Sequence, residues 1–209
     1  MAESLERAWS TRDARRFERL GISGGRASAI AAAAEELSGR VHDHGVVLDV
    51  GCGVGLLARV LNNRTVVGLD YSESLLPEAA AYGPVARASL FALPIAARGC
   101  PAVACLFVLD DYEPSIKETA LRVLASVVAP GGELVVGAYA PDDERMGTRR
   151  AEFSSMTNPV YLEDEQYYEN ALSRVGEPTS VWVRHVLCDG DVDGITVRRH
   201  LLVAGVTVN

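Results

Sequence analysis

The stretch VVLDVGCGVGLLA, residues 46–58, decides the fold, because an unbroken apolar run gives way to glycines at every second position. Residues 46–50 are apolar apart from Asp49, which is typical of a buried strand of a parallel sheet. The glycines that follow are Gly51, Gly53 and Gly55. A strand, a glycine turn and then a helix leave bare backbone and free N–H groups where a ligand can cross. The stretch therefore predicts an α/β ligand-binding unit.

The composition favours a single globular domain with a small-molecule partner. The chain has 209 residues, 48% of them hydrophobic, and 28 acids against 20 bases give a formal charge of -8. An acidic surface disfavours phosphate polymers and anionic membranes, so we expect no nucleic-acid and no membrane partner. The chain begins without a signal-peptide pattern and no apolar run is long enough to cross a bilayer. We therefore expect a cytoplasmic protein.

The thiols and histidines do not predict a metal site. None of the four cysteines lies in a CxxC pair or near a histidine at ligand spacing, so we expect free thiols. They are Cys52, Cys100, Cys105 and Cys188. His42 and His44 flank an acid, but they precede the first strand, at the end opposite to the ligand crevice of a parallel sheet. We therefore predict no bound metal.

Apolar runs alternate with helical patterns along the chain. The expected strands are residues 46–50, 65–70, 84–89, 102–110 and 133–140, and the expected helices between them are 54–62, 72–82 and 114–129. The third of these helices is expected to stop at the Pro-Gly-Gly turn, residues 130–132. A loop over 141–159, a helix over 161–175 and a terminal hairpin of 179–188 with 195–208 complete the pattern. We divide the chain into an N-terminal helical cap, 1–40, and a main domain, 41–209.

The spacing D-x-G-x-G-x-G, from Asp49 to Gly55, resembles the first motif of class I S-adenosylmethionine-dependent methyltransferases. A dinucleotide-binding fingerprint would need its third glycine at position 56, which is Leu56 here, so a nicotinamide oxidoreductase is disfavoured. Three further segments resemble the same family: VVGLDYS around Asp70, the Leu-Pro pair at 93–94, and RVLASVVAPGGELVV at 122–136. Together they cover about residues 46–140.

The resemblance implies a fold and a cofactor. The family fold is a Rossmann-like sheet of seven mostly parallel strands in the order 3-2-1-4-5-7-6, with strand 7 antiparallel, helices on both faces and here an N-terminal helical cap. The implied cofactor is S-adenosyl-L-methionine (SAM), with S-adenosylhomocysteine (SAH) as product. The implied cofactor-binding residues are Asp49, Gly51, Gly53, Gly55, Asp70, Tyr71, Ser89, Leu90 and Phe107. Ser89 stands where the family often has an Asp that binds adenine.

Candidates for catalysis follow the fourth strand. Asp110 and Asp111, in VLDDY, stand where many relatives have histidines, and a carboxylate there could orient an amine or accept a proton. The alternative is that Asp111 merely starts the next helix. His185 and His200 in the terminal hairpin are further candidate bases, although a strand histidine is more often structural.

The resemblance implies methyl transfer to an oxygen, nitrogen or carbon of a small metabolite. Aromatic residues and methionines on segments that cap this fold favour an apolar or aromatic acceptor. They are Trp9, Phe17, Tyr112, Tyr139, Met146, Phe153, Met156 and Tyr161. The alternative is a protein that binds SAM without transferring its methyl group, such as a cyclase-like or regulatory protein.

Overall fold

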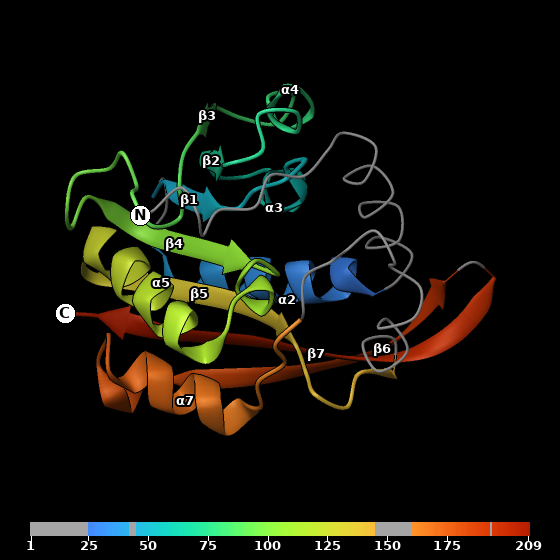
Figure 1. The fold of residues 1–209 in the computed structure, drawn as a ribbon. Coiled ribbons are helices and arrows are strands. Elements are labelled where there is room, and N and C mark those ends of the chain that lie inside the picture. The colour runs from blue at the N-terminus through green and yellow to red at the C-terminus, as the bar shows by residue number, and fades with distance from the viewer. Residues whose placement is uncertain (1–24, 42–44, 145–159, 193) are drawn as a thin grey trace.

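Seven strands form one sheet in the order β3-β2-β1-β4-β5-β7-β6 in the computed structural model, which describes residues 25–41, 45–144, 160–192 and 194–209 (Figure 1). The strands are β1 Val47–Val50, β2 Val66–Asp70, β3 Val85–Arg87, β4 Cys100–Leu106, β5 Val128–Tyr139, β6 Trp182–Val192 and β7 Ile195–Val208. The first five pair in parallel, and β7 is antiparallel to β5 and to β6. The predicted strand order is confirmed.

Helices cover both faces of this sheet (Figure 1). On one face, α2 (Arg26–Arg40) and α3 (Leu56–Val60) share a core with the inner sides of β1, β5 and β7. On the other face, α5 (Pro114–Val127) and α7 (Glu165–Ser173) pack over β4, β5 and β7. A short α4 (Leu76–Ala79) lies beside β3. Two buried faces explain why β1 and β4 are apolar apart from Asp49.

Small side chains bring α2 close to the sheet. Its buried residues are Arg26, Ala29, Ile30, Ala32, Ala33, Ala34 and Leu37. Alanine favours helix and lets the helix backbone approach the strands closely. Gly25 caps the helix with φ +91, and a Cβ there would lie 2.8 Å from the Cys188 Sγ and 3.0 Å from the Arg199 Cγ. The first turn of α2 is therefore fixed against the terminal hairpin.

Several element boundaries differ from the predictions, and the largest differences concern β4, α4 and the junction of α5 with β5. Strand β4 ends at Leu106 and the chain continues into a 3-10 turn, η2 (Leu109–Asp111), so the predicted strand over 102–110 is too long. Helix α5 ends at Val127, ahead of the Pro-Gly-Gly segment, and β5 begins directly after it. Helix α4 has four residues, where 72–82 was predicted. For β4 and α4 the prediction treated a turn as regular structure, whereas the Pro-Gly-Gly segment was predicted as a turn and belongs to β5.

The terminal segments follow the predicted pattern more closely. Helix α7 begins after Asp164, whose side chain accepts a hydrogen bond from the Tyr167 N–H at 2.9 Å. The hairpin is longer than predicted, because β6 continues to Val192 and the turn centres on Gly194, at φ +82. The proposed cap over 1–40 stays a prediction, because residues 1–24 lie outside the described residues. The same holds for residues 42–44, which include the two histidines before the first strand, and for residues 145–159, which make up most of the predicted loop.

Among the described helices, none is both long enough and apolar enough to cross a membrane.

Candidate functional site

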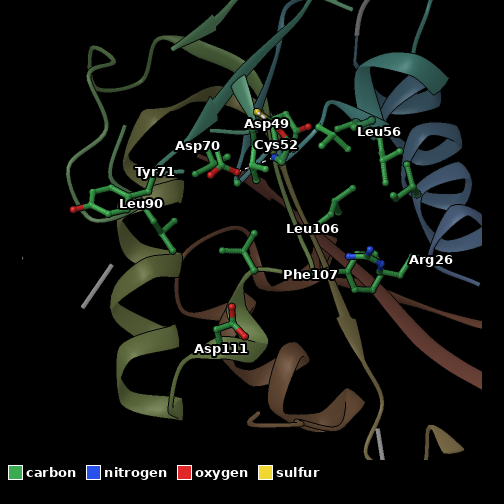
Figure 2. A pocket seen from close by; sticks show the side chains of 18 of the residues that line it. Arg26, Asp49, Cys52, Leu56, Asp70, Tyr71, Leu90, Leu106, Phe107 and Asp111 are labelled. Carbon is green, nitrogen blue, oxygen red and sulfur yellow. Dashed lines mark hydrogen bonds between the residues drawn. The ribbon is translucent and has the colours of Figure 1, made fainter. Parts of the chain in front are cut away.

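A cleft opens at the carboxyl ends of β1, β2 and β4, where the glycine loop turns into α3 (Figure 2). It is lined by Arg26, Ile30, Asp49, Val50, Gly51, Cys52, Gly53, Val54, Leu56, Leu57, Asp70, Tyr71, Leu75, Ala88, Leu90, Leu106, Phe107, Val108, Asp111 and Tyr112. Ligands of open parallel sheets bind at this edge. Seven of the nine predicted cofactor residues line the cleft; Gly55 and Ser89 do not.

Gly51, Gly53 and Gly55 of the loop all have positive φ, but their structural roles differ. A Cβ on Gly51 would lie 2.2 Å from the Val108 Cγ2, so only a glycine fits between β1 and the loop after β4. A Cβ on Gly55 would lie 3.1 Å from the Ala79 Cα, so this glycine lets α4 approach. A Cβ on Gly53 would meet nothing within 4 Å. Gly53 is therefore the part of the loop whose bare backbone faces open space.

The acid at the end of β2 is hydrogen-bonded to this loop. The Gly53 N–H donates to Asp70 Oδ2 at 2.8 Å, and the Ser72 N–H donates to Asp70 Oδ1 at 2.8 Å. Burial raises the pKa of Asp70, while the two amide hydrogen bonds act in the opposite direction. Each carboxylate oxygen has two lone pairs, so both can still accept a hydroxyl from a ligand. The glycine loop and Asp70 thus form one crevice.

Asp49 lies beneath the loop, in the middle of the sheet. It pairs with Gly68 of β2 and Ala104 of β4, and its side chain is 3% exposed. Burial, and secondly the charge of Asp70, raises the pKa of Asp49 to about 7. A buried carboxylate that lines a cleft is stabilised by a cation placed beside it. The position therefore favours a positively charged part of a ligand.

One end of the cleft suits a flat ring. Tyr71 and Leu90 line it on the same side as Asp70 (Figure 2). The ring of Tyr71 carries the Arg87 guanidinium on one face, 5.0 Å from its centroid. Ser89 has a local role, because its Oγ accepts a hydrogen bond from the Phe91 N–H at 3.1 Å.

The opposite end of the cleft is built on Phe107. This residue follows β4 with φ +60, which is strained for a side chain with a Cβ, and its N–H donates to the Gly137 carbonyl at 2.8 Å. The ring lies 5.1 Å from the Tyr139 ring, and the Arg26 guanidinium carbon lies 5.9 Å from its centroid. The buried Arg199 guanidinium lies 5.4 Å from the Tyr139 ring. These contacts link α2 to β7 through Phe107 and Tyr139.

The two adjacent acids of the strand-four loop have different surroundings. Asp111 is half-buried and lines the cleft (Figure 2). Asp110 is 3% exposed and turned away: its Oδ2 accepts from the Tyr139 N–H at 3.2 Å, and its carbonyl accepts from the Tyr161 N–H at 2.9 Å. The structure thus places Asp111 at the cleft and Asp110 in the protein interior.

A buried lysine beneath this loop escaped the sequence analysis. Lys117 of α5 is fully buried, and its Nζ donates to the Tyr161 carbonyl at 2.5 Å and to Glu163 Oε1 at 3.2 Å. Burial lowers its pKa, and the charges of Asp110 and Glu163 oppose that shift. With the Asp110 carbonyl, Lys117 binds both backbone groups of Tyr161 and so attaches the chain after residue 159 to the loop that carries Asp111.

The histidine candidates lie outside the cleft lining. His185 Nδ1 is 2.8 Å from His200 Nε2, and His185 Nε2 is 3.1 Å from Glu165 Oε2 at the start of α7. His200 Nδ1 in turn contacts the Asp142 carboxylate. Each ring nitrogen of the pair thus has a partner on β6, β7, α7 or the segment after β5. The arrangement joins the hairpin to its neighbours.

The Cys52 thiol and the possible metal ligands also bear on the chemistry of the site. Burial raises the pKa of the Cys52 thiol, and the charges of Asp49 and Asp70 raise it further, so the thiol stays protonated and unreactive. Among the described residues, no group of three histidines, cysteines or acids could hold a metal ion. The described lining of the cleft offers backbone amides, the acids Asp49, Asp70 and Asp111, the guanidinium of Arg26 and apolar side chains.

Comparison with known proteins assigns the loop and sheet edge to a family. Residues 47–132 match the family model described as a methyltransferase domain. This segment contains the glycine loop, Asp70, the strand-four loop and α5. No curated protein matches the sequence.

Solved structures share the fold over almost the whole chain. A SAM-dependent methyltransferase from Thermotoga maritima, a possible histamine N-methyltransferase, superposes with a TM-score of 0.71 at 16% identity, covering 95% of this chain and 97% of that one. Magnesium protoporphyrin IX methyltransferase from Synechocystis PCC 6803, with bound SAH, gives 0.62 at 22% identity, covering 88% and 84%. A putative methyltransferase from Haloferax volcanii, in complex with the Trm112 activator, gives 0.65 at 17% identity, covering 95% and 94%.

Proposed function

Because residues 47–132 match the family model of a methyltransferase domain, we propose that this enzyme moves the methyl group of SAM to an oxygen, nitrogen or carbon of a small, apolar or aromatic metabolite. The observation that carries the acceptor class is a set of apolar and aromatic side chains in the lining of the cleft. They are Ile30, Leu56, Leu106, Phe107, Val108 and Tyr112. Such a lining favours an apolar partner over a charged polymer.

The residues of the cleft fit the cofactor. Asp70 can accept both ribose hydroxyls, Tyr71 and Leu90 offer flat and apolar contacts for adenine, and the open backbone at Gly53 leaves room for the sugar. Asp49 supplies negative charge beside the methionine half. These assignments follow from position, and we exclude Ser89 because its hydroxyl serves the turn to Phe91.

Bound SAM supplies a methyl group on a cationic sulfur, so that the acceptor lone pair forms the new bond as the S–CH3 bond breaks. The protein's part is to align the two partners and to exclude water, which the apolar wall at Leu106–Val108 does. An acceptor hydroxyl or ammonium must also lose a proton. Asp111 is the carboxylate on the acceptor side of the cleft, and we assign it that role in preference to Asp110 or His185.

The charge of the chain supports a small acceptor. A net charge of -8 disfavours binding to phosphate backbones and to anionic lipid surfaces. Two similar folds are named for small acceptors, magnesium protoporphyrin IX and histamine, while the Haloferax volcanii protein is seen with an activator protein. A protein partner is therefore compatible with this fold.

The competing function is binding of SAM without methyl transfer. One experiment separates the two: the full chain is incubated with SAM and panels of phenols, amines and aromatic heterocycles, and mass spectrometry follows SAH release together with gain of one CH2 by the acceptor. We expect both signals in at least one panel, and neither with Asp70→Asn. Tight SAH binding with no methylated small molecule would favour the binding protein, and methylated RNA, DNA or peptide would overturn the acceptor class.

A further inference from the structure

Two histidines of the terminal hairpin lie in a row of hydrogen bonds that ends on an acid at each side. The central contact is between His185 Nδ1 and His200 Nε2, which are 2.8 Å apart. At one end, His185 Nε2 lies 3.1 Å from Glu165 Oε2. At the other end, His200 Nδ1 contacts the Asp142 carboxylate. We call these four side chains the histidine clasp, because they join α7, β6, β7 and the segment after β5.

The contacts of the clasp fix the number of hydrogens that its two rings need. A carboxylate only accepts hydrogen bonds, so each of the two outer ring nitrogens must carry a hydrogen. The central contact joins two nitrogens, so one of them must donate and the other must accept. Two outer hydrogens and one central hydrogen make three hydrogens on the four ring nitrogens.

Only a singly charged pair of rings meets this requirement. Two neutral imidazoles carry two hydrogens, so one of the three contacts would set a lone pair against a carboxylate or against another lone pair. Two imidazolium ions carry four hydrogens, so two N–H groups would point at each other across 2.8 Å and two positive charges would lie side by side. The complete clasp therefore holds one proton more than two neutral rings.

The charges around the clasp favour one positive charge over none. Glu165 and Asp142 contact the rings, and Asp143 accepts the His200 N–H at 2.8 Å while the buried Arg199 balances its charge. Acids outnumber bases among the charged groups further out. These are Glu169 on α7, Glu144 after β5, and on the hairpin Asp189 of β6 opposite Arg198 of β7. Nearby negative charge stabilises a charged imidazole, and a second charge would add no further hydrogen bond.

We propose that His185 and His200 share one proton and form a pH-sensitive clasp, complete only while the pair carries a single positive charge. The inference goes beyond the proposed function and does not depend on it, because none of the four side chains belongs to the described lining of the cleft. The clasp strengthens the junction of α7 with the hairpin and with the segment after β5.

The shared proton makes the stability contribution of the clasp largest near neutral pH. In the unfolded chain each imidazole titrates alone, at about pH 6.5. Below about pH 6.5 the unfolded rings bind two protons against one in the clasp, so stability rises with pH. Above about pH 6.5 the unfolded rings bind none while the clasp keeps one, so stability falls as the pH rises. The contribution therefore has a maximum and declines on both sides.

The first test uses nitrogen-15 NMR of the wild-type full chain, which reads the protonation of each ring nitrogen and has only four histidines to resolve. The His185 and His200 rings together should carry three hydrogens from about pH 5.5 to about pH 7.5, one unit on either side of the ordinary value. Two independent rings would pass from nearly four hydrogens to nearly two over the same interval. Such a single-step loss would overturn the inference.

The second test compares melting temperatures of wild type and the double variant His185→Gln/His200→Gln as a function of pH. The difference between the two should be largest at about pH 6.5 and about half as large or less at pH 5 and pH 8. Arg184→Gln is the matched control, because Arg184 is the neighbouring residue of β6 and its ion pair with Glu35, at 2.9 Å, does not titrate over this range. Its effect should not vary with pH.

A difference between wild type and the double variant that is constant, or that changes in one direction only, would refute the shared proton. If the double variant did not fold, the hydrogen count in wild type would decide.

Discussion

The Gly53 amide donates a 2.8 Å hydrogen bond to the Asp70 carboxylate and so joins the glycine loop to the end of β2. The D-x-G-x-G-x-G motif and the acid that ends β2 are thereby joined by a hydrogen bond within the protein itself. Preformed geometry of this kind reduces the entropy lost on binding.

Replacing Asp70 by Asn tests this contact. The amide keeps one acceptor oxygen, so it can serve the Gly53 N–H or the Ser72 N–H but not both, and it loses the charge that two ribose hydroxyls need. We expect SAH affinity to fall by about tenfold to a hundredfold. Calorimetry measures the change, and Glu73→Gln is the control, because Glu73 is exposed and pairs only loosely with Arg87, at 3.8 Å. Equal affinities in all three proteins would contradict a ribose role.

The pKa of Asp49, raised to about 7 by burial and by Asp70, predicts pH-dependent donor binding. A cation beside Asp49 favours its charged form, so binding lowers this pKa and expels a proton whenever the pH is below about 7. SAM affinity should therefore rise between pH 5.5 and about 7 and then level off. Titrations in buffers of different ionisation enthalpy would count the protons. A flat profile in wild type, or the same slope in Asp49→Asn, would exclude Asp49 as the source.

The same carboxyl predicts a gain in stability on substitution. Its folded pKa lies above the ordinary value of 3.8, so the folded state binds more protons than the unfolded state between pH 3.8 and about 7, and stability falls as the pH rises through that range. At pH 8 the cost is on the order of 4 kcal/mol. Asp49→Asn should raise the melting temperature of the ligand-free protein at pH 8 and change it little at pH 4. A lower melting temperature at pH 8 would show that the carboxylate is stabilised in the fold.

The positive φ of Phe107 predicts that glycine at this position gives a more stable protein than alanine, the reverse of the usual order in a strand. At φ +60, glycine relieves a cost of about 1 kcal/mol that alanine retains, and both remove the ring from Tyr139. Phe107→Gly should therefore be more stable than Phe107→Ala in urea denaturation. Leu106, in regular β4, provides the control, because there glycine should be the less stable of the pair. The ordinary order at both positions would mean that Phe107 is unstrained.

His185 offers a negative test of catalysis. Its ring bridges His200 and Glu165, and its side chain is 42% exposed, so His185→Gln should lower the unfolding free energy by about 1 kcal/mol or less. SAH affinity should stay within about twofold of wild type, because His185 does not line the cleft. Calorimetry and thermal melts on the same samples measure both. A large loss of SAH affinity in a variant of normal stability would show that His185 takes part in ligand binding.

The sequence predicted those parts of the site that depend on local backbone chemistry. Alternating glycines after an apolar strand can only be a turn with positive φ, and an acid at the end of the next strand must lie beside it in a parallel sheet. That is why the loop and Asp70 could be predicted from the residues themselves, whereas the strand order was predicted only from the resemblance to the family.

The rest depends on contacts between distant segments. Arg26 comes to the cleft because Gly25 lets α2 start against β6 and β7, and a lone arginine before an alanine-rich helix gives no sign of that. The positive φ of Phe107 has no signature in a residue type that rarely adopts it. Asp110 and Asp111 are chemically identical in sequence, and only the Tyr139 and Tyr161 amides distinguish them.

The place of β7 in the sheet has a consequence for biosynthesis. Strand β6 is made before β7 but touches the sheet only through it, since β7 lies between β5 and β6. Until β7 has left the ribosome, β5 presents an open edge, residues 132–139, whose partner does not yet exist. Open apolar edges invite pairing with other nascent chains. We therefore expect yield in vivo to respond more to chaperone supply than the stability of the finished protein would suggest.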